Sequence, residues 1–86
     1  MKVFVPSPLH RYTAGRSEVA GQGKSISAVL FDLDRQYPGI RFRMIDEQDA
    51  IRPHIKLFVN GERCETLDRA LAPSDEVHII AALSGG

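Results

Sequence analysis

The side chains able to do chemistry in this sequence are few and widely separated. Cys64 is the only cysteine, and His10, His54 and His78 stand at spacings typical of neither a metal site nor a thiol paired with a base. No Gly-x-Ser-x-Gly motif marks a serine nucleophile. We therefore interpret Cys64 as a small, half-buried residue of a short strand rather than as a nucleophile.

A glycine-rich segment from Gly21 to Ser25 precedes a predicted helix and superficially resembles a phosphate-binding loop. The Walker A motif needs another glycine with four residues between it and Gly-Lys-Ser, and this chain has Glu18 there. The segment fits a strand-to-helix turn in which Ser25 caps the helix. The acidic residues at 46, 47 and 49 fit a solvated loop better than a cation site, and Asp32 and Asp34 are expected on the exposed side of the helix.

The end of the chain carries the most informative pattern. The stretch 76–82 runs directly into Leu83, Ser84, Gly85 and Gly86. Glycine has no Cβ, so a diglycine end fits a narrow active site and leaves its terminal carbonyl open to attack. Residues 81–86 reach about 20 Å when extended, so we expect a flexible tail that delivers a carboxylate to a partner's pocket. A cloning remnant or a frayed end is the alternative explanation of the two glycines taken alone.

Length and charge restrict the class of protein. A chain of 86 residues buries about 60% of its unfolded surface, enough for one core and no second domain. Eleven basic and eleven acidic residues give a formal net charge of zero, which disfavours nucleic acid or an anionic membrane as partner. No apolar run has the length of a signal peptide or membrane span, and one cysteine excludes a disulfide framework. We expect a cytoplasmic protein.

Hydrophobic periodicity and turn residues predict the secondary structure. Segment 25–37 has apolar residues at helical spacing and is followed by Pro38-Gly39, which predicts the main helix. Asn60-Gly61 predicts a tight hairpin turn. Segment 40–53 is expected to be a short extended piece followed by a solvated loop. Strands or extended pieces are expected at 1–5, 17–20, 54–59, around residue 64 and at 76–82, with a short turn at 67–71.

These elements predict an α+β domain in which one main helix packs across a mixed sheet of four to five strands. The domain is expected to span residues 1–80 and the tail residues 81–86. Alternation along the strands and the apolar face of the helix define a predicted core, which comprises Val3, Val5, Ile26, Val29, Leu30, Leu33, Ile55, Leu57, Val59, Leu67, Leu71, Val77 and Ile79.

Several short motifs occur in one order along nearly the whole chain. They are Tyr37-Pro38-Gly39, Arg52-Pro53-His54, Phe58-Val59-Asn60-Gly61-Glu62, the turn from Leu67 to Leu71, Asp75-Glu76-Val77-His78-Ile79-Ile80, and Gly85-Gly86. In order and spacing the chain resembles the ubiquitin-like sulfur carriers of the MoaD/ThiS/CysO family, whose fold is the β-grasp. Ala81-Ala82 departs from the proline that many relatives carry after the last strand, which loosens the tail without altering its chemistry.

The resemblance implies that Gly86 performs the function through its terminal carboxylate. An E1-like enzyme would adenylate it with ATP and Mg²⁺, and sulfide or a persulfide would displace AMP to leave a thiocarboxylate. A sulfur-acceptor enzyme, such as a synthase large subunit, would consume that sulfur in making a cofactor, cysteine or a thiolated nucleoside. The chain itself would be a co-substrate that binds no cofactor, and not an enzyme. Leu83, Ser84 and Gly85 would be threaded into the partner.

The alternation of the strands predicts a docking face as well. If the predicted core faces the helix, three apolar side chains on neighbouring strands face away from it, among Lys2, Lys56 and His78. An exposed apolar patch commonly docks a partner, here the activating enzyme. The three residues are Phe4, Phe58 and Ile80. A free monomer that forms complexes with its enzymes is the expected state.

Two other functions use the same features. In the first, the chain is a non-conjugating, ubiquitin-like binding module that docks through its sheet face, and the diglycine is incidental. In the second, the activated Gly86 is attached to lysines, as in ubiquitin itself. Removal of Gly85 and Gly86 distinguishes the binding module from the other two, because only the module works without them.

Overall fold

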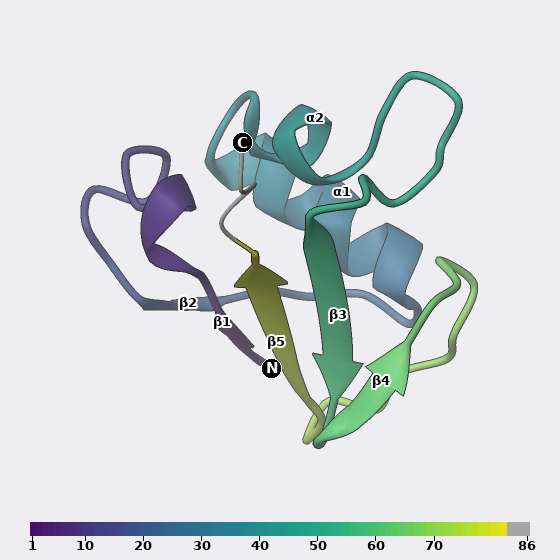
Figure 1. The fold of residues 1–86 in the computed structure, drawn as a ribbon. Coiled ribbons are helices and arrows are strands. Elements are labelled where there is room, and N and C mark those ends of the chain that lie inside the picture. Colours follow the sequence, from purple (N-terminus) through teal and green to yellow (C-terminus); the bar gives the residue numbers. More distant parts are fainter. Residues whose placement is uncertain (83–86) are drawn as a thin grey trace.

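The computed structural model describes residues 1–82, which form a five-stranded sheet and two α-helices (Figure 1). The elements follow one another as β1 (Lys2–Phe4), the 3₁₀ turn η1 (Ser7–Leu9), β2 (Glu18–Ala20), α1 (Ile26–Gln36), α2 (Ile40–Met44), β3 (Ile55–Val59), β4 (Glu62–Cys64) and β5 (Glu76–Ala81).

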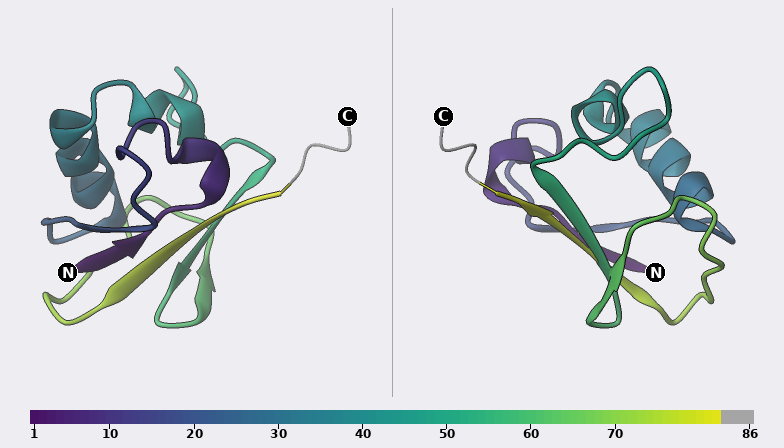
Figure 2. Two further views of the ribbon diagram at one scale, coloured as in Figure 1. Left: turned by 90° about the vertical axis from the view of Figure 1, so that its left-hand side faces the viewer. Right: turned by 45° about the vertical axis from the view of Figure 1, so that its right-hand side comes forward.

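The strands are ordered β2-β1-β5-β3-β4 across the sheet. β1 and β5 pair in parallel, and every other neighbouring pair is antiparallel. Figure 2 shows both helices on the same side of this sheet, so the opposite side is left uncovered. The predicted α+β architecture, a mixed sheet crossed by one main helix, is confirmed.

The main helix α1 begins and ends where the sequence predicts. The Ser25 hydroxyl oxygen accepts a hydrogen bond from the backbone N–H of Ala28 at 3.2 Å, the expected N-cap. The helix stops before Pro38, and Gly39 takes a φ of +97°, a left-handed conformation that favours glycine. Its buried face consists of Ile26, Val29, Leu30 and Leu33, as predicted.

Segment 40–44 is a short helix, α2, so the prediction of an extended piece there is wrong. The Asp34 carboxylate accepts hydrogen bonds from the backbone N–H groups of Gly39 at 3.1 Å and Arg41 at 3.2 Å. These bonds satisfy donors at the start of α2 from a residue of the preceding helix. Ile40 and Met44, one helical turn apart, are fully buried, and Asp34 has this capping role instead of simply facing solvent.

The core contains every predicted member except Leu67, which is only half-buried at its edge. Cys64 is 5% exposed and lies in β4, consistent with its structural interpretation. The core also includes residues that the strand and helix patterns did not select, because they lie in η1, β2, α2 and the residue after it. These are Leu9, Val19, Ile40, Met44 and Ile45.

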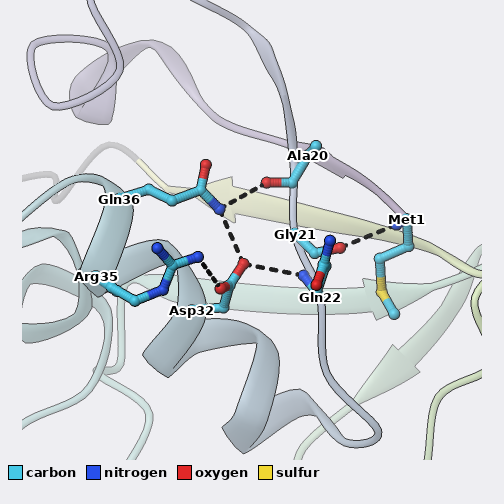
Figure 3. Close-up of polar contacts among 7 residues, drawn as sticks. All are labelled: Met1, Ala20, Gly21, Gln22, Asp32, Arg35 and Gln36. Carbon is cyan, nitrogen blue, oxygen red and sulfur yellow. Dashed lines mark hydrogen bonds and ion pairs between the residues drawn. The ribbon is translucent and has the colours of Figure 1, made fainter.

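Asp32 connects α1 to the segment after the edge strand β2 (Figure 3). Its carboxylate accepts hydrogen bonds from the Gln22 backbone N–H at 3.0 Å, from Arg35 at 2.7 Å and from Gln36 at 2.8 Å. Gln36 also donates to the carbonyl of Ala20 at 3.0 Å. Asp32 was expected to face solvent, but its side chain is only 14% exposed. The bonds, first among them that from Arg35, lower the pKa of Asp32 below its ordinary 3.8.

Replacing Asp32 by Ala is expected to lower the free energy of unfolding by about 1–2 kcal/mol at pH 7, because three donors lose a charged acceptor. A carboxylate with a lowered pKa stabilises the folded state above its unfolded pKa and loses this effect as the pH falls through the folded pKa. The difference between wild type and variant should therefore shrink below about pH 4 in urea titrations. Glu47→Ala, at an exposed carboxylate, is the control, and an equal pH dependence in both variants would contradict this role of Asp32.

Candidate functional site

The predicted tail starts from the middle of the sheet. β5 lies between β1 and β3, and its last residue, Ala81, pairs with Ile55. The backbone N–H of Ala82 donates to the carbonyl of His54 at 2.8 Å, so the chain is held up to the last described residue. β5 ends at Ala81, one residue earlier than predicted. The tail residues proposed to act in the partner, namely Leu83, Ser84, Gly85 and Gly86, lie outside the described residues.

The three predicted docking residues lie on the uncovered side of the sheet. Phe4, His78 and Phe58 are in register on β1, β5 and β3, so their side chains form one row. The rings of Phe4 and His78 are stacked, with centroids 4.3 Å apart and an interplanar angle of 13°. Ile80 follows on the same side of β5, opposite Lys56. The structure thus places the three apolar residues on neighbouring strands, as the alternation predicts.

Their exposure differs from the prediction. Ile80 is 46% exposed, whereas Phe4 and Phe58 are only half-buried and not exposed. His78, between them in the row, stacks on Phe4, and such cross-strand contact removes surface from water. The expectation of an exposed Phe, Phe and Ile patch is therefore wrong for the two phenylalanines. The face is a partly covered aromatic row that leads to one exposed isoleucine two residues before Ala82.

Ion pairs and polar contacts border this face. His78 Nε2 lies 3.8 Å from a Glu76 carboxylate oxygen, and Arg63 on the edge strand β4 lies 3.4 Å from Glu65. Lys56 donates to the Pro53 carbonyl at 3.3 Å. The apolar row therefore has charged groups beside it, the arrangement of an apolar centre with a polar rim that protein interfaces commonly show.

The Gly21–Ser25 segment is a structural turn, as interpreted from the sequence. The first N–H groups of α1 are used within the fold: Ile26 donates to the Arg69 carbonyl at 3.0 Å and Ser27 to the Leu67 carbonyl at 2.8 Å. A Cβ added to Gly23 would lie 2.7 Å from the backbone nitrogen of Val29, so this loop packs directly on the helix. The donors that a bound phosphate would require at a helix N-terminus are already occupied.

The remaining candidates for chemistry are also structural or isolated. The Cys64 thiol is buried and donates to the Thr66 carbonyl at 3.2 Å. Within residues 1–82, no three His, Cys, Asp or Glu side chains gather as metal ligands. The same part of the chain contains no helix with the length and apolarity needed to cross a membrane.

Two exposed aromatic side chains on the helical side were not predicted as site residues. Phe31 on α1 is 57% exposed and Phe42 on α2 is 54% exposed. Each carries an arginine over its ring, Arg41 at 4.2 Å from the Phe31 centroid and Arg52 at 4.6 Å from that of Phe42. The sequence contains the alternation Arg-Phe-Arg at 41–43, which could have indicated these residues. It can be interpreted only once residues 40–44 are known to form a helix.

The topology, a mixed sheet with α1 across one face and a central last strand, defines a ubiquitin-like protein of β-grasp fold. A chain of the crystallised BexX/CysO complex from Amycolatopsis orientalis matches it with a TM-score of 0.90 and 25% identity, covering 99% of this chain and 98% of that one. Small archaeal modifier protein 1 from Methanosarcina acetivorans matches with a TM-score of 0.81 and 28% identity, over 99% of this chain and 94% of that one.

The sequence assigns the family. The ThiS family model matches residues 3–86, and the chain belongs to the ThiS family. The sulfur carrier protein CysO of Mycobacterium tuberculosis is 33% identical over 89 residues, which cover 98% of this chain and 96% of that protein. The resemblance to ubiquitin-like sulfur carriers is confirmed.

Proposed function

We propose that this chain is a sulfur carrier protein whose terminal Gly86 carboxylate is adenylated by an E1-like enzyme and converted to a thiocarboxylate. The observation that carries the proposal is the match, over nearly the whole chain, to CysO sulfur carriers, in a sequence that follows its last strand with Gly85-Gly86. In this role the chain is a co-substrate, and the catalytic residues belong to its partners.

The proposed chemistry converts a poor electrophile into a sulfur nucleophile in two steps. A Gly86 carboxylate oxygen attacks the α-phosphorus of ATP, and the bond to pyrophosphate breaks, which gives an acyl-adenylate. Sulfide or an enzyme persulfide then attacks the acyl carbon, a C–S bond forms, and the C–O bond to AMP breaks. With a persulfide, a second thiol must reduce the S–S bond and become oxidised. ATP and Mg²⁺ are held by the activating enzyme.

The fold supports delivery of the carboxylate to that enzyme. Because β5 is paired on both sides, the point from which the tail starts is fixed relative to the sheet face. The four residues after Ala82 extend at most about 14 Å, so a partner must contact the domain closely around Ala82 for Gly86 to enter its site. A sulfur-acceptor enzyme, building a cofactor, an amino acid or a thionucleoside, faces the same constraint.

Protein modification is the second candidate, and a specific similarity favours it. The fold matches small archaeal modifier protein 1 from Methanosarcina acetivorans at 28% identity. A modifier uses the same adenylate, but a lysine amine replaces sulfide as the attacking group and an isopeptide bond replaces the thiocarboxylate. Both functions need Gly86, whereas a non-conjugating binding module would act through its sheet face alone.

Deletion of Gly85 and Gly86 is expected to abolish ATP-dependent activation, because it removes the carboxylate that attacks ATP from the reach of the active site. The assay is ATP–pyrophosphate exchange with the cognate activating enzyme, followed by thiocarboxylate detection after addition of a sulfur donor. Addition of one alanine after Gly86 is a control that keeps a terminal carboxylate but places it on alanine instead of glycine. Full activity of the deleted chain would contradict the carrier function and favour the binding module.

We also propose that the row of Phe4, Phe58 and Ile80 contacts the activating enzyme. The row leads along the uncovered sheet side towards the end of β5, so a partner that receives the tail lies over it. Ile80, almost half exposed and two residues from Ala82, is the central contact. The half-buried rings of Phe4 and Phe58 widen this apolar surface, and apolar side chains beside charged ones suit a separable complex.

The Phe58→Asp/Ile80→Asp double variant is expected to weaken binding to the activating enzyme by about tenfold or more, because carboxylates replace apolar contacts. Binding is measured by isothermal titration calorimetry. Phe31→Asp, which changes a more exposed phenylalanine on the helical side, is the control and should bind as wild type. Ile80→Asp alone separates docking from stability, because its side chain is exposed. Unchanged affinity in these folded variants would exclude the row as a docking surface.

A further inference from the structure

A cluster of arginine and aromatic side chains includes His54, the residue to which the last described residue, Ala82, is hydrogen-bonded. Arg43, Arg52, Phe42 and His54 line a pocket of about 230 Å³ between α2 and the start of β3. The His54 carbonyl accepts the hydrogen bond from Ala82. In Figure 1, α2 and the start of β3 lie in the upper half of the molecule, and β5 points upward toward them. We call these residues, with Arg11 and Tyr12, the arginine–aromatic patch.

The arginines of this patch are oriented by contacts that, among residues 1–82, use one nitrogen of each guanidinium. Arg43 Nε donates to the Tyr12 hydroxyl at 2.6 Å, and Arg52 Nε donates to the Phe42 carbonyl at 2.7 Å. Within residues 1–82, neither guanidinium has a carboxylate within 4.0 Å. In this described part of the chain, the two terminal nitrogens of Arg43 and Arg52 have no hydrogen-bond partner and suit the paired hydrogen bonds that a carboxylate accepts.

Local charge and exposure support binding of an anion here. The Arg11 guanidinium lies 5.3 Å from the Tyr12 ring centroid, on the residue that also receives the Arg43 hydrogen bond. That hydrogen bond, together with the charges of Arg43 and Arg11, lowers the pKa of Tyr12 below its ordinary 10.0. Phe42, 54% exposed, adds an apolar surface beside these cations. Arginine and aromatic residues together are the composition enriched at protein interfaces.

We propose that the arginine–aromatic patch docks an acidic surface of the activating enzyme, next to the opening that receives the tail. The inference rests on the proposed function for the identity of the partner, and on the position of His54 against Ala82 for its location. Carboxylates of the partner pair with Arg43 and Arg52, while the apolar row on the sheet contacts a second part of the same enzyme. The row lies on the uncovered side of the sheet, whereas the patch lies between α2 and the start of β3.

The observations favour an acidic protein over a nucleic acid. The chain has a formal net charge of zero, so it offers no general attraction for a polyanion. The acidic loop at 46–49 borders the patch, and Arg52 contributes to lowering the pKa of Asp46, whose hydrogen bonds from Ala50 and Gln48 lower it more. A continuous phosphate backbone bound at the patch would come close to these carboxylates and be repelled by them. A protein surface can instead place its own cations opposite the carboxylates.

The test compares two charge reversals with the same change in net charge. Arg43→Glu/Arg52→Glu is expected to weaken binding of the chain to the cognate activating enzyme by about tenfold or more at low ionic strength, measured by isothermal titration calorimetry. Lys24→Glu/Arg35→Glu, at exposed basic residues outside both the patch and the sheet row, should change the affinity by less than about twofold. About 0.5 M salt should reduce the difference between the variants, because it screens the exposed charges.

A second variant distinguishes the loss of the arginine charges from a loss of folding. Arg43→Gln/Arg52→Gln removes both charges but retains side chains that can donate to Tyr12 and Phe42, and it should weaken binding in the same direction. Melting curves of all variants identify any that is unfolded. Affinities of the two patch variants equal to wild type would overturn the inference.

Adenylation of Gly86 in the same samples separates this inference from the proposed function. If the wild-type chain is adenylated and the patch variants bind the enzyme as tightly as wild type, the patch is not a docking surface, and the proposed carrier function is unaffected. If binding depends on the patch but no adenylate forms, the docking surface stands and the carrier function fails. No binding by the wild-type chain would overturn both. A single-stranded RNA oligonucleotide is tested in the same assay. If it binds through the patch more tightly than the enzyme does, the partner is a nucleic acid and not an acidic protein, and the inference is overturned.

Discussion

The parallel pairing of β1 with β5 fixes the position of the last described residues of the chain. Val3 of β1 and Val59 of β3 both lie opposite Val77 of β5, and all three are fully buried. A last strand held on both sides cannot fray without opening the centre of the sheet. Ala82, the last described residue, is therefore held at a defined position, hydrogen-bonded to His54 of the arginine–aromatic patch. A co-substrate that must present its terminus to an enzyme needs this fixed starting point.

The helical layer stabilises that sheet and leaves its other side available. α1 buries its apolar face, and the Asp32 network joins it to the segment after β2, while Asp34 caps the start of α2. Polar groups that the sequence alone would place in solvent thus determine how the helices are held. With the helices on one side, the aromatic row of β1, β5 and β3 remains on the other.

Local patterns predicted the regular elements, because the helix 26–36 and the strand 55–59 depend on periodicity within a few residues. α2 was missed because Asp34 satisfies its first donors and Gly39 makes the turn, a contact between segments. The predicted exposure of Phe4 was wrong because His78 stacks on it from a strand distant in sequence. The arginines at 43 and 52 come together only when α2 and the start of β3 become neighbours. The role of Gly86 lies outside the described residues and stays a prediction from the sequence, because it depends on position in the chain and not on folding.

The central claim is that Gly86 carries sulfur. Its most direct test is the intact mass of the protein isolated from its native host, with an alkylating reagent present to trap thiocarboxylates. The account predicts a gain of about 16 Da, sulfur in place of one oxygen, plus the mass of one alkyl group from the trapping reagent, localised to Gly86 by fragmentation. An unmodified carboxylate that also persists after incubation with ATP, a sulfur donor and the cognate activating enzyme would contradict it.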